Sequence, residues 1–132
     1  MNKKIIEQLS ELQKRKQERA QLHLEKLQQQ ELELINSIKQ KDYEIEALRN
    51  ESINFKAISY GNLAGCVINR LEIRKIEFKL TQYVVDIEKT RFQQRKLVKE
   101  LDDLKKEIIK AKEELRKYII KIEKYDYCKT II

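Results

Sequence analysis

Apolar residues recur at steps of three and four along two long stretches of this chain of 132 residues. Such steps place side chains on one face of an α-helix, so each stretch predicts a long helix with an apolar seam. The first stretch runs from about residue 3 to residue 57, and polar Glu31, Lys41 and Ser52 interrupt its seam. Its apolar seam positions are Leu24, Leu27, Leu34, Ile38, Ile45, Leu48 and Phe55.

Nearer the N-terminus an apolar stripe consists of Ile5, Leu9 and Leu12, and the polar residues 13–19 follow it. Joining this stripe to Leu24 through Lys16 and Ala20 takes consecutive four-residue steps. Such a stutter locally unwinds a coiled coil. We therefore predict an irregular start to the first helix.

The second stretch, from about residue 62 to residue 125, is more regular. One seven-residue column reads Ile73, Leu80, Ile87, Gln94, Leu101, Ile108, Leu115 and Ile122. Its companion, three residues further on, reads Ile76, Tyr83, Thr90, Leu97, Leu104, Ala111, Tyr118 and Tyr125. Seven heptads of this kind predict a coiled-coil seam.

The segment between the two stretches contains Tyr60-Gly61-Asn62, close to the midpoint of the chain. Gly61 can take the left-handed conformation that ends a helix, and Asn62 can cap the next helix. We therefore predict an all-α fold in which two long helices form one antiparallel coiled-coil hairpin, spanning residues 1–132 as a single domain. The expected parts are helix one over about 3–57, a turn over about 58–65 and helix two over about 66–127.

Arms of roughly 60 residues would make a rod of about 90 Å at ~1.5 Å rise per residue. The alternative is a short kink in one continuous helix, which would then dimerise.

Composition limits the possible fold classes further, because the chain has no Pro, only two Gly and 39% charged residues. Sheets and barrels need many turns, so we do not expect them. No apolar run approaches the ~18 residues of a membrane span, and the first residues lack the apolar core of a secretory signal. In a hairpin, Cys66 and Cys128 would lie too far apart for a disulfide, so we expect free thiols in a reducing cytosol.

Catalytic chemistry finds few candidates. His23 is the one histidine, and we expect it to be a solvated helical residue. Gly61 and Gly65 are not followed by the Lys-Ser or Lys-Thr of a phosphate loop. Carboxylates are abundant, but a thin hairpin offers no pocket that would perturb them. We expect no enzyme activity, no cofactor and no metal site.

A second apolar column lies away from the seam of the second stretch. We call it the back stripe: Leu71, Phe78, Val85 and Phe92, which recur every seven residues and follow Val67. At ~100° per residue, Leu71 lies about 160° from the column of Ile73. An exposed row with two phenylalanines predicts a surface that a partner covers. The alternative is that supercoiling, hairpin crossing or a dimer buries it.

Charge is unevenly distributed. The formal net charge is +7, of which residues 1–60 carry +1 and residues 61–132 carry +6. Basic residues gather in three runs along the chain. Runs of this kind are usually solvated helix faces, but at one end of a rod they could dock an acidic ring. The runs are Lys14, Arg15, Lys16 and Arg19; Arg91, Arg95, Lys96 and Lys99; and Lys105, Lys106, Lys110, Lys112, Arg116 and Lys117.

A basic hairpin of this size resembles the central-stalk proteins of type III secretion systems (the FliJ/YscO kind). The matching features are an irregular first arm, a central break at Tyr60-Gly61-Asn62 and a second arm with a regular seam that begins near Val67, Leu71 and Glu72. The resemblance covers nearly the whole chain and rests on pattern, because the family has no sharp signature.

The resemblance implies a hairpin similar to the coiled coil of the rotary ATP synthase γ subunit. Its open end would insert in the pore of a hexameric secretion ATPase in the cytoplasm, at the base of the membrane-embedded apparatus, and promote ATP hydrolysis. The terminal stripes Ile5, Leu9, Leu12, Leu115, Tyr118 and Ile122 would form the inserted part. Lys14, Arg15, Arg19, Arg116 and Lys117 would contact the ATPase. Val67, Leu71 and Phe78, continued by Val85 and Phe92, would face the cytoplasmic domain of the export gate, although Arg74 interrupts this face; substrate chaperones are further partners.

Two other functions stay open at this point. A basic coiled-coil arm could bind nucleic acid, which the net charge favours; the absence of aromatics interleaved with Arg and the 22 acidic residues argue against it. A structural coiled-coil dimer is the third possibility.

Overall fold

The computed structural model describes residues 2–64 and 69–131. Helix α1 spans Lys3–Leu63 and helix α2 spans Arg70–Ile131. The two long helices pack against each other, which confirms the predicted all-α helical hairpin. Within the described part of the chain, no helix is long and apolar enough to cross a membrane.

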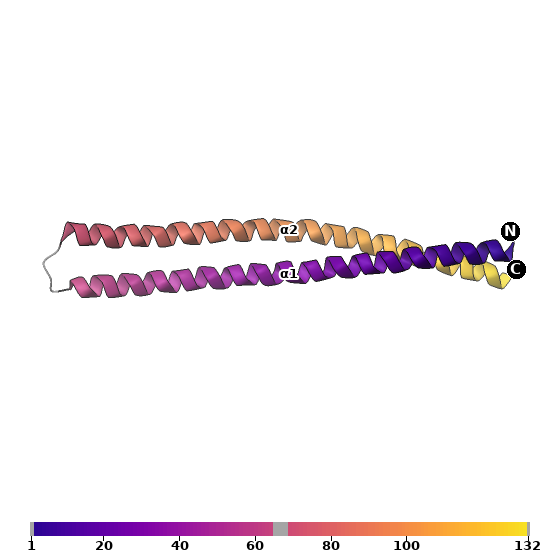
Figure 1. Cartoon of the computed structure of the whole chain (residues 1–132), viewed down its shortest axis with the longest axis horizontal. Coiled ribbons are helices and arrows are strands. Elements are labelled where there is room, and N and C mark those ends of the chain that lie inside the picture. The colour runs from indigo at the N-terminus through magenta and orange to yellow at the C-terminus, as the bar shows by residue number, and fades with distance from the viewer. Residues whose placement is uncertain (1, 65–68, 132) are drawn as a thin grey trace. The chain divides into compact units, whose positions relative to one another are not determined.

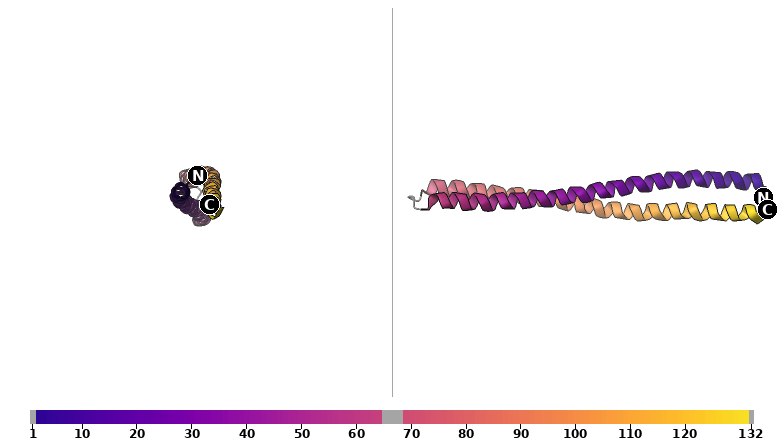
Figure 2. Two further views of the ribbon diagram at one scale, coloured as in Figure 1. Left: turned by 90° about the vertical axis from the view of Figure 1, so that its right-hand side faces the viewer. Right: turned by 90° about the horizontal axis from the view of Figure 1, so that it is seen from below.

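Two compact units make up the chain. The terminal unit combines Met1–Glu33 with Glu100–Ile132, and the central unit is Leu34–Lys99. In each unit a segment of α1 lies beside a segment of α2 and runs in the opposite direction (Figures 1 and 2).

Asparagine side chains begin both helices. The Lys4 backbone N–H donates to Oδ1 of Asn2 over 3.0 Å. In α2, the Leu71 backbone N–H donates to Oδ1 of Asn69 over 2.9 Å. Each side chain thus satisfies one of the amides that the first turn leaves without a helical partner.

The predicted helix boundaries near the turn were wrong. Helix α1 continues to Leu63, so most of the predicted turn is helical, and α2 begins at Arg70. Gly61 lies inside α1 and is not left-handed. Glycine within a helix costs only about 1 kcal/mol, which the continuing seam outweighs. The cap of α2 is Asn69, while Asn62 belongs to α1; Gly65, Cys66 and Val67 lie outside the described residues.

The seam of α2 follows the two predicted columns, because every residue of both columns is buried or half-buried. The predicted seam of α1 from Leu24 to Phe55 is likewise buried or half-buried. The terminal unit holds most of the buried apolar side chains: Ile6, Leu24, Leu27, Leu101, Leu104, Ile108, Ala111 and Ile122. In the central unit most seam side chains are half-buried, with Ile45, Ile76 and Thr90 buried.

The predicted stutter in the first helix was wrong. The buried or half-buried positions of α1 continue from Leu24 toward the N-terminus in alternating steps of four and three. Two residues of the stripe predicted there lie beside the seam, since Ile5 is 47% exposed and Leu12 is 45% exposed, while Leu9 is half-buried. An unbroken heptad register therefore places polar side chains inside. The seam positions before Leu24 are Ile6, Ser10, Gln13, Gln17 and Ala20.

Candidate functional site

Polar side chains occupy the seam of the terminal unit near the two chain ends. Ser10 has no exposed surface, and its hydroxyl donates to Oδ1 of Asp126 on α2 over 3.3 Å. Gln13 is 7% exposed, and among the described residues its Oε1 finds no hydrogen-bond partner. A buried amide oxygen without a partner costs about 1–3 kcal/mol. This end of the hairpin is held together less firmly than an apolar seam would hold it.

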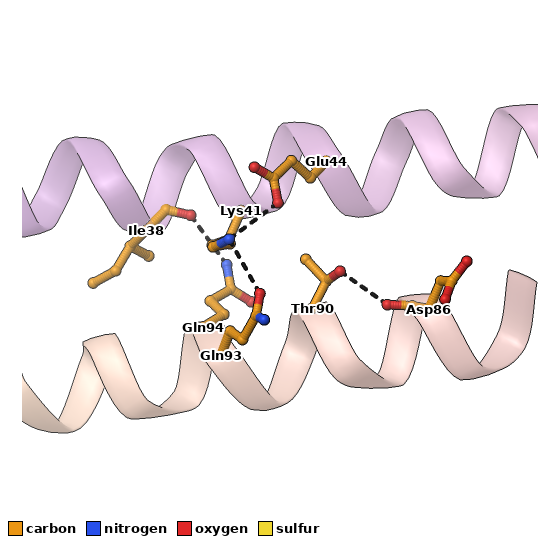
Figure 3. A network of polar contacts seen from close by, with 7 residues as sticks. All are labelled: Ile38, Lys41, Glu44, Asp86, Thr90, Gln93 and Gln94. Atoms are coloured by element: carbon orange, nitrogen blue, oxygen red, sulfur yellow. Dashed lines mark hydrogen bonds and ion pairs between the residues drawn. The ribbon is translucent and has the colours of Figure 1, made fainter.

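A second polar layer crosses the central unit (Figure 3). Lys41 Nζ donates to Oε1 of Gln93 over 3.1 Å and lies 3.2 Å from Oε2 of Glu44. Gln94 Nε2 donates to the Ile38 carbonyl oxygen over 3.2 Å and to Oδ1 of Asp42 over 2.6 Å. One polar exception of each predicted seam, Lys41 in the first and Gln94 in the second, therefore lies in this layer.

Polar groups that satisfy one another only in one alignment fix the register of two helices at a cost in stability. Ser10 is opposite Asp126 in the terminal unit, and Asp42 is opposite Gln94 in the central unit. Both pairs belong to the same antiparallel register. We interpret the two polar layers as alignment devices.

The cations predicted to contact an ATPase are all exposed, but the structure does not bring all five together. Lys14 lines a surface hollow with Gln17 and Ile122. Arg15 lines another hollow and lies 3.9 Å from the Glu11 carboxylate. Lys14 and Arg15 therefore lie about 100° apart around α1. Arg15 and Arg19, four residues apart, share a helix face but line separate hollows.

Arg19 and Lys117 do lie near a common feature, the Tyr118–Glu114 pair. Arg19 lines a hollow with Glu114 and Tyr118, and Lys117 lines a neighbouring hollow that includes the same two residues. The Tyr118 hydroxyl donates to Oε1 of Glu114 over 3.1 Å. This hydrogen bond, followed by desolvation and the negative charge of Glu114, raises the pKa of Tyr118 above its ordinary value.

Lys16 and His23 line the same hollow as Arg19, and the sequence-based site did not include them. Their spacing was the available signal, because residues 16, 19 and 23 are separated by steps of three and four and share a helix face. His23 is exposed, as predicted.

The back stripe is exposed along the central unit, so neither supercoiling nor the partner helix covers it. Leu71 is 58% exposed, Phe78 67%, Val85 53% and Phe92 53%. Lys96 Nζ lies 4.6 Å from the centre of the Phe92 ring. Val67, the predicted start of this surface, lies outside the described residues.

Aromatic side chains join the two helices elsewhere in the central unit. The ring centres of Phe55 and Tyr83 are 6.0 Å apart, and Lys79 Nζ lies 4.6 Å from the centre of the Phe55 ring. These contacts are part of the seam, so they stabilise the pair and leave the back stripe free of the other helix.

Metal-binding chemistry has no candidate within residues 2–64 and 69–131, where no three His, Cys, Asp or Glu side chains cluster suitably. Cys128 is half-buried with a free thiol. The candidate sites are therefore surfaces: the charged perimeter of the terminal unit and the back stripe of the central unit. No protein-family model matches the chain, and no curated protein or solved structure is significantly similar to it.

Proposed function

We propose that this protein is a central stalk of the FliJ/YscO kind in a type III secretion ATPase complex. Its terminal unit inserts in the pore of a hexameric ATPase on the cytoplasmic side of the secretion apparatus and promotes ATP hydrolysis. Its central unit contacts the cytoplasmic domain of the export gate, and substrate chaperones are further partners.

The observation that carries this proposal is the perimeter of the terminal unit. A helix pair enclosed by a ring meets protein on every side, so its contacting groups must be distributed around it. Lys14 and Arg15 lie about 100° apart around α1 and line separate hollows, and Arg19 lines a hollow that includes Glu114 and Tyr118 of α2. Exposed apolar side chains are distributed over both helices of the unit as well: Ile5, Leu12, Leu22, Ile109, Ile120 and Tyr127.

The correction of the first seam changes which residues the ring would contact. Ile5 and Leu12, assigned to the seam from the sequence, are exposed and available to a partner. Ile122 is buried against α1, and Tyr118 and Leu115 are half-buried. The proposed contact surface therefore consists of the exposed residues of the terminal unit, and the buried ones hold the two helices together.

The proposed mechanism is mechanical and breaks no bond in this chain. One helix pair in a sixfold ring cannot offer the same surface to all six subunits. The subunits consequently differ in their contacts with the stalk, and those contacts favour some nucleotide states over others. A differential contact of this kind is what coupling between two sites requires.

The proposed gate contact uses the back stripe, at Leu71, Phe78, Val85 and Phe92. Arg74 is exposed next to this row, and Val67, which the sequence also assigned to the contact, lies outside the described residues. A surface of exposed phenylalanines in heptad spacing is suited to a packed contact with another helix.

Charge reversal tests the ATPase contact. The triple variant Lys14→Glu, Arg15→Glu and Arg19→Glu is added to the secretion ATPase encoded in the same genome, and ATP hydrolysis is measured. The original chain is expected to stimulate hydrolysis and the variant is not, with helicity by circular dichroism unchanged.

The matched control carries the same charge change on the same helix in the central unit, at the exposed residues Lys39, Arg49 and Lys56. This control is expected to keep the stimulation. Equal stimulation by both variants would show that Lys14, Arg15 and Arg19 do not contribute to the ATPase contact. A lack of stimulation by the original chain would overturn the proposed function.

A further inference from the structure

The flanks of the back stripe carry a strong excess of positive charge. The stripe occupies the heptad position opposite the seam of α2, and the neighbouring outward positions between residues 71 and 99 are exposed. Among the positions three and four residues from the stripe, Glu88 is the acidic residue, and Arg91 lies 2.8 Å from its carboxylate. Lys75 lies 3.7 Å from the Glu72 carboxylate, so its charge is compensated as well. The basic residues of this face are Arg74, Lys75, Lys89, Arg95, Lys96 and Lys99.

The apolar row and the basic flanks form one continuous surface. Lys96 shows how they combine, because its ammonium group lies 4.6 Å from the centre of the Phe92 ring. Long basic side chains commonly extend apolar surface in this way while the charge stays in water. A partner therefore meets a narrow apolar row edged by cations.

Three kinds of occupant fit this surface poorly. A second copy packed stripe against stripe would set basic flanks against basic flanks, and like charges placed together oppose association. A lipid surface is bound by helices with a broad apolar face. The stripe and the positions three and four residues from it offer one apolar residue per heptad, and the exposed Val84 and Val98 lie about 100° to one side. Phe78 and Phe92 are about 21 Å apart along the helix, at ~1.5 Å per residue, which is too far for consecutive bases to stack.

We propose that the back stripe binds an acidic amphipathic helix of a partner protein. An apolar residue every seven positions, or about 10 Å, matches the heptad repeat of another helix lying along α2. Asp and Glu beside the partner's apolar row would face the Lys and Arg that flank Phe78 and Phe92. This inference deepens the proposed function, since it gives the chemistry of the contact that the proposal assigns to the export gate.

Selection from a displayed peptide library tests this chemistry without any knowledge of the gate. The library presents helices with a fixed apolar heptad row and randomised flanking positions, and the full-length chain is the target. The expected outcome is enrichment of Asp and Glu at the flanks. Selected peptides are then synthesised, and their affinities are measured at low and high salt.

Two sets of variants locate the contact. The double variant Phe78→Ser and Phe92→Ser is expected to lose at least about tenfold in affinity, because large aromatic side chains dominate such contacts. The control, Tyr43→Ser and Ile53→Ser, removes equally exposed apolar side chains from α1 in the same unit and is expected to stay within about twofold. The charge-reversed chain Lys89→Glu, Lys96→Glu and Lys99→Glu should instead select basic flanks.

Selection without acidic enrichment would overturn the inference, as would equal losses in the two double variants. Stripe-dependent binding to vesicles with anionic lipids, or to a random DNA duplex, would also overturn it and would identify a different class of partner. ATPase stimulation does not enter this experiment, so its failure and the failure of the proposed function are separate results.

Discussion

Replacing Gln13 by Leu should stabilise the terminal unit. Gln13 is 7% exposed, and its Oε1 has no hydrogen-bond partner among the described residues. Relieving a buried unsatisfied group is worth about 1–3 kcal/mol, and burying a leucine side chain adds about 1.5–3 kcal/mol. Imperfect packing in a seam shaped around glutamine opposes part of this gain. We expect a net increase of about 1–3 kcal/mol in the free energy of unfolding.

Urea unfolding followed by circular dichroism at 222 nm measures this change. The matched control is Gln29→Leu, which makes the same substitution at an exposed position of α1 in the same unit. The control is expected to change the free energy of unfolding by less than about 0.5 kcal/mol. If Gln13→Leu were no more stable than Gln29→Leu, the unbroken register of the first seam would be refuted.

Three further predictions concern the seam, a cap and a titration. Ile108→Ala should cost about 2–4 kcal/mol of unfolding free energy and its exposed neighbour Ile109→Ala less than about 1 kcal/mol, measured by the same unfolding assay; equal costs would contradict the assigned seam. Asn69→Ala should destabilise α2 by about 1 kcal/mol while Asn69→Asp does not, and identical unfolding of the two would exclude the cap. The Tyr118 hydroxyl, isolated by subtracting the tyrosinate absorbance of Tyr118→Phe, should titrate above pH 10.0, and Glu114→Gln should lower its midpoint. Because the pKa of Tyr118 is raised on folding, the stability contributed by its proton is complete below pH 10.0 and is lost as pH rises through the pKa of the folded protein. A titration midpoint that Glu114→Gln leaves unchanged would contradict the hydrogen bond between Tyr118 and Glu114.

The seam of α2 could be predicted from the sequence because nearly all of its positions are apolar. The N-terminal seam of α1 could not, because hydrophobicity there pointed to Ile5 and Leu12, which are exposed. The heptad register decided which N-terminal residues are buried. The heptads further along α1 fix the face that packs against α2, and Ser10 and Gln13 lie on that face. Ser10 is small, and Asp126 accepts its hydrogen bond, so its burial is tolerated.

The helix boundaries at the turn could not be predicted for a different reason. Asn62 and Asn69 are equally good caps by residue type, and Gly61 is compatible with a helix end or a helix interior. Local propensity therefore left the boundaries open within several residues. Packing decided between them, since Leu63 is half-buried and extends the contact of α1 past the glycine.

The candidate site was predicted in part. The back stripe followed from heptad spacing alone, because a position opposite the seam is exposed in any two-helix pair. The cations of the terminal unit were grouped by closeness in sequence, although neighbouring residues point about 100° apart on a helix. Lys14 and Arg15 consequently line different hollows. Arg19 shares a helix face with Arg15 but lines a third hollow with Lys16 and His23.

The stoichiometry of the complex with the secretion ATPase tests the central claim most directly. Native mass spectrometry of the assembled complex gives the number of copies of this chain for each ATPase ring. A stalk enclosed by the ring predicts one copy bound to six ATPase subunits. Six copies for each ring would place the chain on the outside of every subunit and would contradict the proposed mechanism.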